Sequence, residues 1–135
     1  MRYNFSMDDG GDAAGHWAEE PHLENVDAAR DYLMLQYEPR VAGRIADDLA
    51  KVETLRVYTA DDVLRAAGLE PLRRKDRRVR AQLEVIGTDE QLAPVLLARD
   101  VSRHALVIAD GLDRLCASRI ADPGAIVACR IVTVS

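Results

Sequence analysis

Apolar residues recur at helical spacing in two consecutive stretches of the chain, within residues 25–53. The apolar positions are Val26, Ala29, Leu33 and Tyr37 in the first stretch, and Val41, Ile45, Leu49 and Val52 in the second. Asn25 is a plausible N-cap for the first helix, and Pro39 is typical of the first position of a second helix. We expect a helical hairpin that packs on its own domain, with a dimer or partner surface as the alternative.

The rest of the chain alternates short β-branched stretches with amphipathic ones. Strands are expected over residues 54–58, 93–98, 104–108 and 125–134. Helices are expected from Thr59 to Gly68, through the basic stretch up to Gly87, and from Gly111 to about Ala121. Short strands with helices between them and hairpin-length links predict an α+β fold, with a small mixed sheet and packed helices.

Composition separates the N-terminus from the rest of the chain. The 135 residues fit one domain, and a 48% hydrophobic, 30% charged composition is ordinary for a globular protein. Residues 1–24 have only Phe5 and Trp17 as apolar anchors, so we expect a disordered acidic tail there. A helical hairpin (25–53) and a domain over 54–135 then follow. The sequence has no apolar run of the membrane-span or signal-peptide type, so we expect a cytoplasmic protein. The frequent arginine and alanine residues indicate a bacterial coding bias.

The sharpest local feature is the corner within "VIADGLDRLCAS", residues 107–118. An apolar strand ends at Asp110, and a helical pattern begins directly after Gly111. Gly111 permits a positive φ, and the helix start offers unpaired amides to an anion. Arg114 lies one turn into the helix, where its guanidinium could reach that anion. The corner therefore has the parts of a phosphate site, although Asp110 could instead cap the same amides.

The order of elements around this corner resembles the ParB/sulfiredoxin superfamily. The resemblance covers about residues 54–133 and rests on "VRAQLEVIGTDEQLAPVLLA" followed by Asp-Gly-x-x-Arg-x-x-Ala. It implies that Gly111, Arg114 and Ala117 form a helix start that binds nucleotide phosphates. Leu112 replaces the family's glutamate or catalytic cysteine, and Asp113 replaces its arginine or histidine. The resemblance therefore predicts the scaffold without the family's known catalytic routes.

Other candidate groups are fewer. The basic run at residues 73–80, "RRKDRRVR", is either a solvated surface or a phosphate-contacting segment, and the resemblance brings one of Arg77, Arg78 or Arg80 toward the corner. Asp110 and Asp113 could hold Mg²⁺ with a nucleotide, or could serve only the helix terminus. The two cysteines, Cys116 and Cys129, are expected to be reduced, and Cys116 to lie in the core.

Three function classes follow from these patterns. The first is a nucleotide- or phosphate-binding protein that uses Asp110, Gly111, Asp113, Arg114, Arg78 and Arg80, with Mg²⁺ as a possible companion of the nucleotide. The second is a non-catalytic interaction or regulatory module of antitoxin-like type, which contacts a protein partner through the tail or the helical hairpin. The third is a DNA-processing protein, which the net charge of −5 disfavours. No catalytic residue and no resident metal site is predicted.

Overall fold

The computed structural model describes residues 16–134 as an α+β protein. Its strands are β1 (Arg56–Thr59), β2 (Val95–Asp100), β3 (Ala105–Asp110) and β4 (Ile126–Val134). Its helices are α2 (Leu23–Leu33), α3 (Pro39–Lys51), α4 (Ala60–Ala67), α5 (Arg77–Ile86) and α6 (Leu112–Ala121). None of these helices is long and apolar enough to cross a bilayer.

The strands form one mixed sheet in the order β1-β4-β2-β3. The β2 strand pairs antiparallel with β3 and parallel with β4, so β2 and β4 form its centre. The β1 strand pairs antiparallel with β4, but only from Arg56↔Cys129 to Thr59↔Ile126. The second half of β4 therefore extends past the first residue of β1, Arg56.

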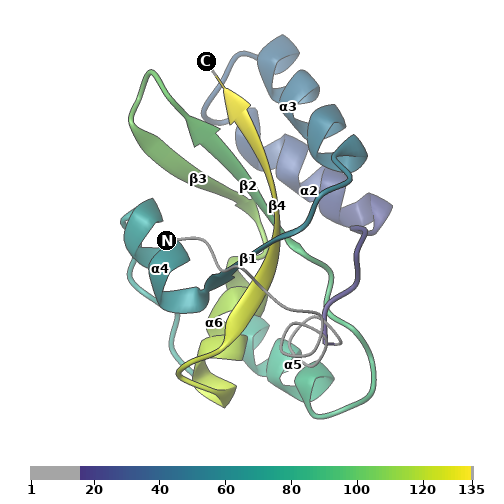
Figure 1. Cartoon of the computed structure of the whole chain (residues 1–135), viewed down its shortest axis with the longest axis vertical. Coiled ribbons are helices and arrows are strands. Elements are labelled where there is room, and N and C mark those ends of the chain that lie inside the picture. The colour runs from purple at the N-terminus through teal and green to yellow at the C-terminus, as the bar shows by residue number, and fades with distance from the viewer. Residues whose placement is uncertain (1–15, 135) are drawn as a thin grey trace.

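Helices cover both faces of the sheet (Figure 1). On one face, α2 and α3 pack on each other and on β3 and β4, and Leu33, Ile45 and Leu49 belong to the core there. On the other face, α4, α5 and α6 pack around Leu97 and Leu115. Successive strand residues point to opposite faces, so each buried strand supplies both cores. This is why the strands read as nearly continuous apolar runs.

The predicted helix termini are mostly confirmed. Pro39 is the first residue of α3, and Gly68 ends α4 with a left-handed φ of 70°. The Thr59 hydroxyl accepts a hydrogen bond from the Asp62 amide at 3.2 Å, as expected of an N-cap. The strands lie one or two residues further along the chain than the pattern indicated.

Two predictions near the N-terminus are wrong. The first helix begins at Leu23 rather than after Asn25, because Asn25 lies in the first turn and its side chain accepts the His22 amide at 2.8 Å. Trp17 lies inside the predicted tail, yet its side chain is buried and the residue pairs with Leu92. The packed part of the chain thus starts before Asn25, while residues 1–15 of the predicted tail lie outside the described residues.

Arg130 explains why the segment after Trp17 stays on the sheet. Its guanidinium, almost fully buried, donates to the carbonyl of Glu19 at 2.9 Å and to those of Leu49 and Ala50 at 3.1 Å. One side chain on β4 therefore ties the end of α3 and the N-terminal segment together. A buried arginine with several carbonyl partners is satisfied without a carboxylate.

Candidate functional site

Gly111 forms the predicted strand-to-helix corner between β3 and α6. Its φ is 106°, a conformation that residues with a side chain rarely adopt. A Cβ added at this position would lie 2.8 Å from Arg114 Nη2 and 3.2 Å from the Cα of Val95. Gly111 is needed here because the Arg114 guanidinium and the start of β2 occupy the space beside it.

Arg114 is directed into the protein and not toward the mouth of the corner. Its Nε donates to the carbonyl of Ala93 at 2.8 Å, and its Nη2 donates to the carbonyl of Pro94 at 3.0 Å and to Asp110 Oδ2 at 3.2 Å. The side chain is only 8% exposed. Arg114 therefore joins the start of β2 to the end of β3, and these donors are not directed at a ligand.

Asp110 does not cap α6, which was the alternative to an anion site at the corner. Its carboxylate accepts from Arg114 and, at 3.3 Å, from the side-chain amide of Asn25 on α2. Burial raises the pKa of Asp110, and the negative charge of Asp113 acts in the same direction, while Arg114 opposes both. Asp113 Oδ1 accepts the Arg114 amide at 2.9 Å. Two carboxylates at the start of one helix repel an approaching phosphate.

Arg78 and Arg80 separate at the start of α5. Arg78 forms an ion pair with Asp76 at 3.2 Å, and this partner raises the pKa of Arg78 most, with a smaller contribution from Asp113. Arg80 instead lines an exposed hollow of about 470 Å³ with Arg73, Arg74 and Lys75. The predicted set is thus only partly brought together: Asp110, Gly111, Asp113 and Arg114 meet at the corner, and Arg80 faces a hollow of its own.

Both thiols lie in the core. Cys116 is fully buried and its Sγ accepts the amide of Leu72 at 3.3 Å, so the expectation of a core cysteine is confirmed. Burial raises the pKa of Cys116, and it raises the pKa of Cys129 to about 12. Neither is set up as a nucleophile. Within residues 16–134, no cluster of three His, Cys, Asp or Glu side chains is arranged to hold a metal ion.

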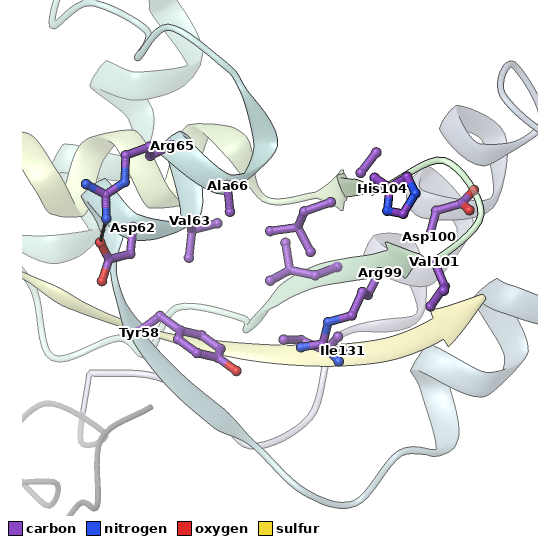
Figure 2. Close-up of a pocket in the computed structure, with 13 residues that line it drawn as sticks. Tyr58, Asp62, Val63, Arg65, Ala66, Arg99, Asp100, Val101, His104 and Ile131 are labelled. Carbon is purple, nitrogen blue, oxygen red and sulfur yellow. Dashed lines mark hydrogen bonds and ion pairs between the residues drawn. The ribbon is translucent and has the colours of Figure 1, made fainter. Parts of the chain in front are cut away.

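A second concave site lies on the sheet face that α4 covers only in part, and the sequence did not indicate it. We call it the sheet hollow; it measures about 570 Å³ (Figure 2). Its apolar surface comes from all four strands and α4, through Tyr58, Val63, Leu97, Leu106 and Ile131. The hollow exists because α4 has only eight residues, while β2, β3 and β4 continue beyond it.

Polar side chains surround this apolar surface. Arg65 is paired with Asp62 at 2.9 Å. Arg99 has only a long contact, 3.4 Å from Nη1 to the hydroxyl of Thr133, and among residues 16–134 no carboxylate forms an ion pair with it. The neighbouring carboxylate of Asp100 is engaged elsewhere, since it accepts the Tyr37 hydroxyl at 2.6 Å.

His104 completes the far end of the hollow, in the turn between β2 and β3. Its φ of 50° makes it the one non-glycine residue with a positive φ in the described part of the chain. Histidine is among the residue types that adopt this conformation more readily. The turn thereby places an imidazole at the rim of the hollow, opposite α4 (Figure 2).

One signal in the sequence could have pointed to the sheet hollow. In "VLLARD", Arg99 has the same parity as Val95 and Leu97, so the period of a strand places a charge on the face of two core residues. A charge on a buried face indicates either an internal ion pair or an opening in the helical cover. In the structure, the helical cover of the sheet is open beside Arg99.

Comparison of the chain with protein-family models, with curated proteins and with solved structures found no match.

Proposed function

We propose that this protein is a non-catalytic binding module and that the sheet hollow is its binding site. The observation that carries the proposal is Arg99, a guanidinium without a carboxylate partner in the described residues, placed over an apolar surface. Arg114 at the corner is in the opposite situation, because carbonyls and Asp110 already accept its hydrogen bonds. We therefore assign the Gly111 corner a structural role, in which Arg114 connects the start of β2 to the end of β3.

The composition of the hollow supports a ligand with an apolar body and a negative charge. Its volume of about 570 Å³ lies within the roughly 300–1,000 Å³ of typical ligand sites. Apolar side chains supply most of the binding free energy in such sites, and a few polar groups fix the orientation. Arg99 and His104 are donors suited to a carboxylate or a similar anion.

The ParB/sulfiredoxin-like scaffold belongs to the same proposal. The order of elements from β1 to β4 supports it: a strand, a helix ending at Gly68, two antiparallel strands, the Gly111 corner and a last strand. In this interpretation the helical hairpin of residues 25–53 covers the second face of the sheet, and α2 and α3 do pack there.

We expect the dye 1-anilinonaphthalene-8-sulfonate, which joins an aromatic body to an anion, to bind one molecule per folded chain. Arg99→Ala should weaken this binding roughly tenfold, because a hydrogen bond to a charged group is lost. Fluorescence titration measures the affinity. Arg44→Ala is the matched control, since Arg44 is exposed on α3. If Arg99→Ala binds the dye as tightly as the wild type, the sheet hollow is not the site.

Isothermal titration with ATP, CTP and GTP, with and without Mg²⁺, tests the nucleotide hypothesis for the corner. We expect no saturable heat, because Arg114 has internal acceptors and two carboxylates lie at the mouth. Saturable heat with any of the three nucleotides would contradict this expectation. If that heat decreased in Arg78→Ala but not in Arg80→Ala, whose side chain faces a separate hollow, the corner would be the binding site that the sequence indicated.

A further inference from the structure

The second half of β4 is an open sheet edge beside the sheet hollow. On one side β4 pairs with β2 through Val134, whereas on the other side its pairing with β1 ends at Cys129. Within residues 16–134, no strand continues this second side from Arg130 to Val134. An unpaired edge is a template to which another extended chain can add.

The main-chain groups at this edge can be identified. On the β2 side, the carbonyl of Val134 accepts the amide of Val101 at 2.9 Å. On the β1 side, the carbonyl of Ala125 accepts the amide of Ala60 at 3.1 Å. Residues along a strand present their N–H and C=O groups alternately to the two sides. Ile131 and Thr133 therefore direct theirs to the open edge.

The side chains beside the edge favour a particular sequence in an added strand. Arg99 starts on β2 and reaches across β4, so that its guanidinium lies near Thr133 and Ile131 (Figure 2). A carboxylate on an added strand would meet this guanidinium, and an apolar residue two positions away would meet Ile131 and Tyr58. On the opposite face the half-buried Val132 offers a further apolar contact.

We infer that the occupant is an extended segment of a partner protein, with alternating apolar and acidic residues, which adds to β4 as a fifth strand. This inference rests on the proposed function, because the side chains of the segment would fill the sheet hollow. Main-chain hydrogen bonds to Ile131 and Thr133 give affinity, and Arg99 selects an acidic side chain. A second copy of this chain fits less well, since pairing two β4 edges would bring both copies of Arg99 to one face.

The test is a selection of random, strand-length peptides, displayed in a library, against the whole protein. We expect the enriched peptides to alternate apolar and acidic residues. Methylation of the peptide nitrogens that face β4 should weaken binding at least roughly tenfold by fluorescence anisotropy, because the hydrogen bonds are lost while the side chains remain. This arm leaves the protein unchanged, so its folding is not in question.

Protein variants provide the second arm. Thr133→Pro removes an edge N–H and should also weaken the enriched peptides at least roughly tenfold, whereas Arg44→Ala should bind them like the wild type. Circular dichroism checks that Thr133→Pro is folded. Enriched peptides that tolerate both methylation and Thr133→Pro would overturn strand addition. Wild-type protein that forms dimers, which Thr133→Pro dissociates, would assign the edge to a second copy.

The two proposals can fail separately. If the wild type binds the anilinonaphthalene dye in an Arg99-dependent manner but enriches no peptide, strand addition is overturned and the sheet hollow remains a binding site. If the dye titration shows no dependence on Arg99, the proposed function itself is wrong.

Discussion

Replacing Arg114 by alanine should lower the free energy of unfolding by about 3 kcal/mol, as expected when one partner of a buried ionic network is removed. The truncation leaves the carbonyls of Ala93 and Pro94 without their donor. Within residues 16–134, it leaves the half-buried carboxylate of Asp110 with Asn25 as its one remaining side-chain partner. Each buried acceptor that loses its hydrogen bond contributes about 1–3 kcal/mol of lost stability, and these effects overlap.

Urea unfolding followed by circular dichroism measures this change. Arg119→Ala is the matched control, because Arg119 lies on the same helix but pairs with Asp61 at the surface, and it should change stability by less than about 1 kcal/mol. Arg114→Lys should fall between the two, since one ammonium group cannot reach acceptors on both sides of a planar guanidinium. Equal effects of Arg114→Ala and Arg119→Ala would contradict the structural role assigned to the corner.

The position of the strand-to-helix corner at Gly111 could be predicted from the sequence. Whether Arg114 is available there to bind a ligand could not. An apolar run, a glycine and a helical pattern within twelve residues are local signals, and β3, Gly111 and α6 follow them. Apart from the ion pair that they form with each other, the partners of Arg114 and Asp110 lie far away in the sequence. Ala93 is 21 residues from Arg114, and Asn25 is 85 residues from Asp110. The residues next to an arginine in the sequence do not show whether its guanidinium is already hydrogen-bonded within the protein. Only the fold shows this.

The sheet hollow could be predicted only in part, for a related reason. Its residues come from four strands, one helix and the turn between β2 and β3, and the order β1-β4-β2-β3 is not contained in any local pattern. The period of β2 could place Arg99 on the α4 face, but the length of α4 and the late start of β1, at Arg56, decide whether that face is covered. Periodicity predicts which residues share a face, and topology decides what covers it.

Replacing Gly111 by alanine should destabilise the protein by about 2–3 kcal/mol, because the φ of 106° is strained for alanine and the new Cβ displaces Arg114. Thermal unfolding followed by circular dichroism measures the effect. Gly43→Ala is the matched control: Gly43 lies within α3, and among residues 16–134 no atom outside the adjacent helix backbone and chain neighbours is within 4 Å of the added Cβ. The change should stabilise the protein by about 0.5–1 kcal/mol. A Gly111→Ala protein as stable as the wild type would mean that the backbone between β3 and α6 can adapt to a side chain at this position. The position of Arg114 would then not depend on Gly111.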